Sequence, residues 1–290
     1  MLTKEEFHNL LKSGPLLLDG ATGSNLQKAG MPKGCCTEEW ILTNPEAIIA
    51  LQRSYAEAGS NIIYAPTFQA QPIALERVNL HRQTEAINAQ LVALSRAAAP
   101  GCLIAGDLTT LATFCDSWDE GCFDLLVENY RRQIRGLIDG GADLLVGETL
   151  LYPQEAEAIL TAAELEGAGA GMYTFTMQPD GSLFSGQDAG PVLRDLEEAG
   201  AAAVGFNCVA ADMMTPHLVS KLRRSVKGPL ICKPNAGVPV IGGDGIPYYP
   251  QTCEEFSSIV KQCHENGASI LGGCCGTAPA YIAAVKNTVK

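Results

Sequence analysis

The chain has 290 residues, 47% hydrophobic and 18% charged, a composition that excludes a disordered protein. It carries 20 Lys and Arg against 32 Asp and Glu, and the net charge of −12 disfavours binding to nucleic acid or to an anionic membrane. No apolar run reaches the roughly 18 residues of a transmembrane helix, and the N-terminus lacks the apolar stretch of a signal peptide. We therefore expect a cytoplasmic globular protein without nucleic-acid or membrane partners.

The elements follow in chain order. Residues 1–14 predict a short helix, because Thr3 and Glu6 have the spacing of a capping box. Short apolar runs followed by turn residues predict buried strands at 16–20, 61–66, 103–108, 143–149, 172–177, 203–208, 230–235 and 269–274. Amphipathic stretches predict helices at 46–58, 73–98, 122–139, 153–166, 189–199, 212–225, 252–265 and 278–288.

This strict alternation predicts one α/β domain over residues 1–290, a single (β/α)8 TIM barrel. The alternative is a doubly wound open sheet. Such a sheet usually stops near six strands and has a G-x-G-x-x-G turn after the first, a pattern that the DGATGS segment does not fit.

The active site of such a barrel lies where the strands end. Side chains placed there by the predicted strands are Asp19, Thr67, Phe68, Asp107, Glu148, Asn207, Cys208, Lys233, Asn235, Cys274 and Cys275. Three thiols and three carboxylates that are far apart in sequence are therefore expected to meet at one mouth.

The thiols point to a metal. Three cysteines with an open position are typical of catalytic zinc, and Gly272 and Gly273 would let Cys274 and Cys275 face one ion together with Cys208. A second adjacent pair, Cys35 and Cys36, competes for this role but lies in a loop. The chain has eleven cysteines, and in a reducing compartment we expect no disulfide framework. The remaining cysteines are expected to be ordinary thiols: Cys102, Cys115, Cys122, Cys232, Cys253 and Cys263.

The charged strand ends have several interpretations. Asp19 and Glu148 each end an apolar run, and because a buried acid is costly unless paired or used, we expect both to be functional. Asp107 could instead cap the following segment. Lys233 could form a Schiff base, as in an aldolase barrel, or could pair with a strand-end acid. The histidines lie on expected helices or loops and are not expected to be ligands: His8, His81, His217 and His264.

The motifs LLLDGATGSNLQKAG, GETL, GFNC, KPNAG and LGGCCGT, in this order and spacing, resemble the zinc-dependent homocysteine S-methyltransferase family. That family includes the homocysteine-binding module of cobalamin-dependent methionine synthase. The resemblance covers nearly the whole chain. It implies a methyltransferase that activates L-homocysteine as a zinc-bound thiolate and methylates it to methionine.

The resemblance also implies residue roles. Zinc would be bound by Cys208, Cys274 and Cys275, with Asn235 as a fourth ligand when substrate is absent. The amino group of homocysteine would bind Asp19 and Glu148, and its carboxylate the backbone amides of Ala21, Thr22 and Gly23. Thr67 and Phe68 match the family after the second strand and are expected to contact substrate, although Ala65 and Pro66 before them depart from its pattern.

The methyl donor is the open question at this point. A methylcobalamin-carrying protein partner or domain is favoured because the chain is compact. S-Methylmethionine or betaine is the alternative, for which aromatic side chains would be expected at the mouth; the candidates are Phe68, Phe114, Trp118 and Tyr173. The segment LTTLATFC after the third strand departs from the family and adds to the uncertainty over the donor. Outside this family, the chain could be a Schiff-base aldolase or a non-catalytic zinc-binding protein.

Overall fold

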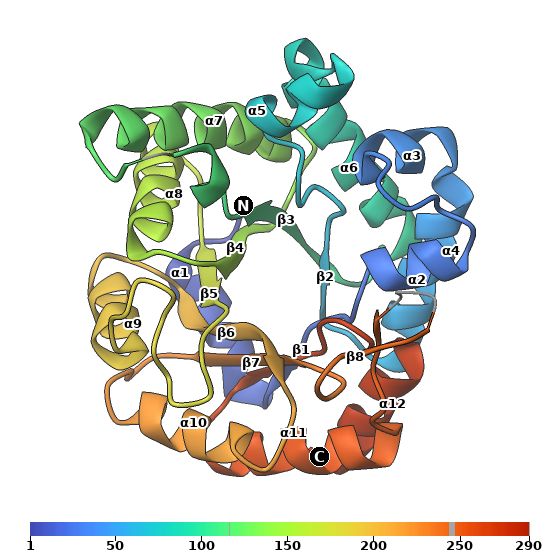
Figure 1. The fold of residues 1–290 in the computed structure, drawn as a ribbon, viewed down its shortest axis with the longest axis vertical. Helices are drawn as coiled ribbons and strands as arrows, with labels where there is room; N and C mark the ends of the chain where they lie inside the picture. Colours follow the sequence, from blue (N-terminus) through green and yellow to red (C-terminus); the bar gives the residue numbers. More distant parts are fainter. Residues whose placement is uncertain (116, 244–246, 290) are drawn as a thin grey trace.

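The computed structural model describes residues 1–115, 117–243 and 247–289. Its main sheet has eight strands in the order β1-β10-β7-β6-β5-β4-β3-β2, with every paired neighbour parallel. The strands are β1 (Leu16–Leu17), β2 (Ile62–Tyr64), β3 (Leu103–Thr109), β4 (Leu144–Leu150), β5 (Gly171–Phe175), β6 (Ala203–Ala210), β7 (Leu230–Asn235) and β10 (Ile270–Leu271). They stand around a common centre (Figure 1), which confirms the (β/α)8 barrel and excludes the open sheet.

The helices surround the strands (Figure 1). They are α1 (Lys4–Leu10), α2 (Gly23–Lys28), α3 (Thr37–Thr43), α4 (Pro45–Ala58), α5 (Pro72–Leu75), α6 (Thr84–Ala98), α7 (Glu120–Asp139), α8 (Pro153–Leu165), α9 (Ala189–Glu198), α10 (Thr215–Arg223), α11 (Cys253–Glu265) and α12 (Pro279–Thr288). Short 3₁₀ turns lie at Leu11–Ser13, Glu76–Val78, His81–Gln83 and Ala112–Phe114. The expected continuous helix over 73–98 is wrong, because the left-handed Asn79, with φ of 59°, interrupts it.

The first helix closes one end of the barrel. The capping box of Thr3 and Glu6 is confirmed, and α1 buries Phe7 among side chains that point into the barrel from the strands. The backbone N–H of Leu2 donates to the carbonyl oxygen of Asp143, and Leu2 accepts from Ala170. Asp143 and Ala170 directly precede β4 and β5, so this segment lies across the N-terminal ends of the strands.

Strands β1 and β2 meet in a seam held largely by side chains. The Asn61 N–H donates to the Leu17 carbonyl at 2.7 Å, and the Leu17 N–H donates to Asn61 Oδ1 at 2.8 Å. Further along the two strands, the Tyr64 N–H donates to Asp19 Oδ2 at 2.9 Å. Asp19 therefore takes part in closing the barrel.

Three short elements were not expected from the sequence. Helices α2 and α3 fold the loop after β1, and an antiparallel hairpin of β8 (Val240–Ile241) and β9 (Pro247–Tyr248) follows β7. The hairpin strands are exposed and only two residues long, so no apolar periodicity announces them. Among the described residues, no helix combines the length and the apolar character needed to span a membrane.

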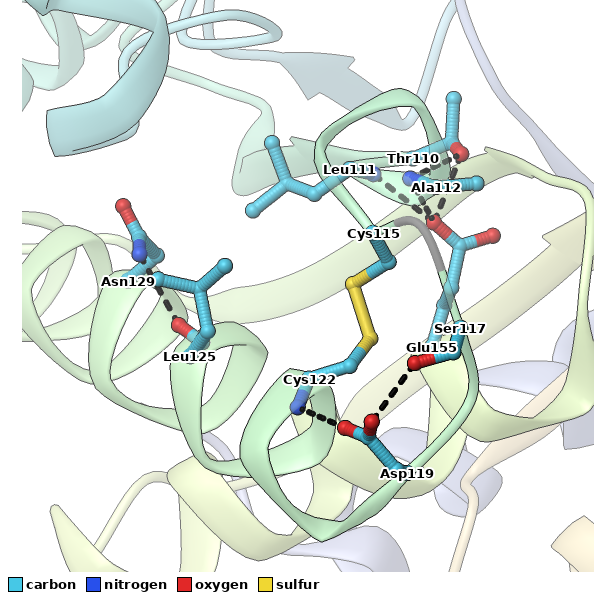
Figure 2. The surroundings of a disulfide bond; sticks show 10 residues. All are labelled: Thr110, Leu111, Ala112, Cys115, Ser117, Asp119, Cys122, Leu125, Asn129 and Glu155. Carbon is cyan, nitrogen blue, oxygen red and sulfur yellow. Dashed lines mark hydrogen bonds between the residues drawn. A yellow bond between two sulfur atoms is a disulfide. The ribbon is translucent and has the colours of Figure 1, made fainter.

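The expectation that Cys115 and Cys122 are ordinary thiols is wrong, because they form a disulfide bond (Figure 2). Cys115 follows the 3₁₀ turn after β3, and Cys122 lies in the first turn of α7, which Asp119 caps by accepting from the Cys122 N–H. The bond therefore fastens the loop after β3 to the helix that follows it. Nothing in a seven-residue spacing signals this pairing, since the fold of the loop decides it.

Candidate active site

A cavity of about 400 Å³ opens at the C-terminal ends of the barrel strands. Its lining includes side chains from the ends of six strands: Asp19, Asp107, Glu148, Cys208, Lys233, Cys274 and Cys275. The expected convergence of thiols and carboxylates is therefore found, on the end of the barrel opposite to α1.

The three predicted thiols form one cluster. The sulfur atoms of Cys208, Cys274 and Cys275 all lie within 4.8 Å of one another, and those of Cys208 and Cys275 are 3.8 Å apart. Sulfur atoms bound tetrahedrally to zinc at ~2.3 Å lie about 3.8 Å from each other, so this donor set fits the ion in both chemistry and spacing. In the described part of the chain, no other group of His, Cys, Asp or Glu has such an arrangement.

The backbone that presents the thiols is unusual. Cys208 has a left-handed conformation, with φ of 57°, where the β6–β7 register shifts. Gly272 and Gly273 are needed because there is no room for a side chain at either position. A Cβ on Gly272 would lie 2.7 Å from the Leu18 Cβ, and one on Gly273 would lie 2.5 Å from Thr277 Oγ1. The glycines thus let the Cys274–Cys275 turn pack tightly against its neighbours.

Asn235 joins the two thiol-bearing segments. Its Nδ2 donates to the Cys208 carbonyl at 3.1 Å, and its Oδ1 accepts from the Cys275 N–H at 3.0 Å. The side chain is 6% exposed. It therefore fixes the spacing between the Cys208 and Cys275 backbones.

The cluster concentrates negative charge on one sulfur. Hydrogen bonds from Cys208 and Cys274 lower the pKa of Cys275 to about 3. The neighbouring Cys274 and Cys275, together with burial, raise the pKa of Cys208 above its ordinary value. Tyr249, which sequence reasoning missed because it follows the hairpin rather than a strand, also lowers the pKa of Cys275. Cys275 is therefore the thiol of the cluster that loses its proton most easily.

Lys233 is paired with the strand-end acids. Its Nζ lies 3.2 Å from Glu148 Oε2 and 4.0 Å from Asp19 Oδ1, and 4.7 Å from the centre of the Tyr64 ring. Burial lowers the pKa of Lys233, but Glu148, Cys274 and Asp19 outweigh it and hold the pKa well above the usual value. A Schiff-base lysine needs a free amine, so the geometry favours the ion-pair interpretation over the aldolase.

Burial also acts on the acids. It raises the pKa of Asp19 to about 7, against the opposing effects of Lys233 and the Tyr64 N–H. It likewise raises the pKa of Glu148, again against Lys233. Glu148 is followed by the left-handed Thr149, with φ of 59°, at a register shift between β4 and β5. Asn207 holds this bend, because its amide accepts from the Thr149 N–H and donates to the Thr149 hydroxyl.

Of the remaining residues predicted to contact the substrate, some line the cavity and one does not. Thr22, Gly23 and Phe68 line the cavity, and so does Ala21, whose N–H already donates to Thr277 Oγ1. Thr67 is not part of the lining. Its hydroxyl is fully buried and joins β3, donating to the Asp107 carbonyl and accepting from the Asp107 N–H.

The competing candidates lie elsewhere. Cys35 is exposed. Cys36 directly precedes α3, and burial raises the pKa of its thiol to about 11. His8 and His264 each bond a backbone carbonyl oxygen, of Ala202 and Ala268. None of these is part of the thiol cluster.

Known proteins are similar to this chain over nearly its whole length. Residues 16–289 match the family described as homocysteine S-methyltransferase. The chain is 26% identical to methionine synthase from Mycobacterium tuberculosis over 97% of this chain but 25% of that protein. A second methionine synthase, from Mycobacterium leprae, is matched over 24% of its length, so the chain spans about a quarter of these curated relatives.

Solved structures are similar over their full length. The metallated form of the homocysteine methyltransferase MmuM from Escherichia coli is 26% identical, with a TM-score of 0.82 over 97% of this chain and 99% of that one. A methyltransferase from Methanosarcina mazei, 13% identical with a TM-score of 0.64 over 99% of this chain and 98% of that one, shares the fold. With its family match over nearly all residues, the chain belongs to the homocysteine S-methyltransferase family.

Proposed function

We propose that residues 1–290 are one homocysteine-binding barrel domain of a zinc-dependent methyltransferase that converts L-homocysteine to methionine. The observation that carries the proposal is the cluster of Cys208, Cys274 and Cys275 at the mouth, beside two buried acids. Zinc bound there would supply the positive charge that keeps a substrate thiol deprotonated at neutral pH.

The chain's own residues would bind and orient the amino acid. Asp19 and Glu148 would accept hydrogen bonds from its ammonium group, since both carboxylates face the cavity. The N–H groups of Thr22 and Gly23, which donate to no described residue, would receive its carboxylate, with Ala21 supplying backbone beside them. Phe68 would pack against the substrate, whereas Thr67 would contribute indirectly, by holding Asp107 of β3 in place through its hydroxyl.

Asn235 would take the fourth position at the metal when substrate is absent. Its Oδ1 accepts the Cys275 N–H, yet an amide oxygen has a second lone pair, so the same atom can serve both partners. Entry of the substrate thiol would then leave Asn235 as the bridge between the two cysteine segments.

We propose a methylcobalamin-carrying protein partner or further domain as the methyl donor. Two observations support it. The relatives named methionine synthase are about four times as long as the matched region. Of the four aromatic candidates for binding a cationic methyl donor, Phe68 alone lines the cavity, and Tyr173 is buried at 1% exposure. A small donor such as S-methylmethionine or betaine is the second candidate, because MmuM is matched over 99% of its length.

The oxidation state of the cysteines bears on the cellular compartment. The nine free cysteines support the cytoplasm, whereas the disulfide of Cys115 and Cys122 is the observation against it. We retain the cytoplasm as the proposed compartment, to be checked by whether the disulfide persists in protein isolated under thiol-trapping conditions.

X-ray absorption at the zinc edge tests the proposal. The zinc-loaded protein should change from three sulfur neighbours and one lighter atom to four sulfur neighbours when L-homocysteine is added. Cys208→Ala serves as the control and should not bind zinc with the same stoichiometry. An unchanged spectrum would remove homocysteine as the acceptor. Methylcobalamin, S-methylmethionine and betaine would then be compared as donors by methionine formation.

A further inference from the structure

Two carboxylate oxygens in the cavity have no close hydrogen-bond donor among the described residues. They are Asp19 Oδ1 and Asp107 Oδ1, and each is buried, whereas Glu148 Oε2 has the ammonium group of Lys233 at 3.2 Å. The three residues come from the ends of β1, β3 and β4 and line the same cavity. A buried acceptor without a donor is costly, so two such oxygens in one cavity indicate that a ligand supplies the donors.

Asp107 is the least explained of the three. It is 5% exposed, and its backbone is fully engaged with Thr67 and Gln133. Its carboxylate accepts no hydrogen bond from a described residue, so the expected role as a cap is wrong. Buried acids outside the cavity accept hydrogen bonds, since Glu38 accepts from the Gln69 N–H and Glu155 from the Leu111 N–H.

The charges around Asp107 do not balance. Lys233 pairs with Glu148 and Asp19, but no described basic group lies within 4.0 Å of Asp107. Three carboxylates therefore share one lysine. Burial and the neighbouring Glu148 raise the pKa of Asp107 well above its ordinary value. A ligand ammonium group would supply a positive charge here, together with N–H donors for Asp107 Oδ1 and Asp19 Oδ1.

We propose that Asp107 is a third substrate-binding carboxylate, which makes the site selective for an acceptor thiol that carries an α-ammonium group. Lys233 remains in place as the counter-ion of Glu148 and Asp19, and the substrate ammonium supplies the charge and the donors that Asp107 lacks. This inference rests on the proposed function, since it assigns the amino group of the same substrate.

Calorimetric titration of the zinc-loaded protein with two thiols tests the inference. The ligands are L-homocysteine and 4-mercaptobutanoate, the same acid without its amino group. Asp107→Asn removes the charge and keeps the shape, and Asp195→Asn, at an exposed site on α9, is the matched control. The wild-type protein and the control should prefer homocysteine. Asp107→Asn should weaken homocysteine binding about tenfold to a hundredfold and leave 4-mercaptobutanoate binding unchanged.

Each result has a distinct meaning. Zinc stoichiometry and the melting temperature of the metal-free variant report folding, and Asp107→Asn should melt no lower than wild type because it removes an uncompensated buried charge. If the variant retains the full preference for homocysteine, or loses affinity for both thiols equally, Asp107 does not bind the ammonium group. If neither thiol binds the wild-type protein, the homocysteine assignment itself fails and the inference with it.

Discussion

Cys208 combines a metal-ligand position with a backbone conformation that L-residues avoid. Its φ of 57° places it in the left-handed region, at the β6–β7 register shift that turns its thiol into the cavity. A non-glycine residue pays roughly 1 kcal/mol or more for this conformation. Such strain is typical of functional positions, where the surrounding structure imposes it.

We therefore predict that metal-free Cys208→Gly is more stable than metal-free Cys208→Ala by about 1 kcal/mol, measured by urea unfolding. Cys274 is the matched control, since it belongs to the same cluster and has no positive φ. There the order should reverse, with Cys274→Gly less stable than Cys274→Ala. Equal stability of the two Cys208 variants would show that the left-handed backbone carries no cost.

At the scale of elements, Glu155 fastens two loops at the mouth. This fully buried side chain of α8 accepts from the hydroxyl and N–H groups of residues 110–112 at 2.6, 2.7 and 3.0 Å (Figure 2). Its other oxygen accepts from the N–H groups of Leu151 and Tyr152 at 3.0 and 3.2 Å. The loops after β3 and β4 therefore share one carboxylate.

We predict that Glu155→Ala lowers the free energy of unfolding by about 3 kcal/mol or more, because it leaves several buried donors without an acceptor. Chemical denaturation measures the change. The matched control is Glu157→Ala, an exposed residue two positions along the same helix, which should shift stability by less than about 0.5 kcal/mol. A small effect at both positions would mean that water replaces the carboxylate at these donors.

The elements also show which features a sequence can reveal. The ends of the strands can be predicted from the sequence, because an apolar run that stops at Asp19 or Glu148 marks both the strand and its end at the mouth of the barrel. Contacts made by irregular loop segments cannot be predicted from the sequence. Glu155 has no Ser or Thr before its helix to signal a cap, since Tyr152 stands there. The bond between Cys115 and Cys122 depends on the path of a loop, and Asp107 is exceptional only because its neighbours leave it unpaired.

At the scale of the whole molecule, the barrel closes where its ladder is weakest. Strands β3 to β6 pair through backbone ladders, whereas the β1–β2 seam depends on the side chains of Asn61 and Asp19. Asp19 accepts from the Tyr64 N–H with one oxygen and faces the cavity with the other. Closure of the fold and binding at the mouth thus share one side chain.

We predict that Asn61→Ala opens this seam without loosening the rest of the barrel. The Leu17 N–H loses its acceptor, Asn61 Oδ1, so its hydrogen exchange should accelerate about tenfold or more, corresponding to the roughly 1–3 kcal/mol of an unpaired buried donor. Amides of β5, which is paired on both sides, should keep their wild-type rates. Exchange measured residue by residue decides the matter, because a uniform acceleration in β5 would mean that the barrel opens as one cooperative unit rather than at a seam.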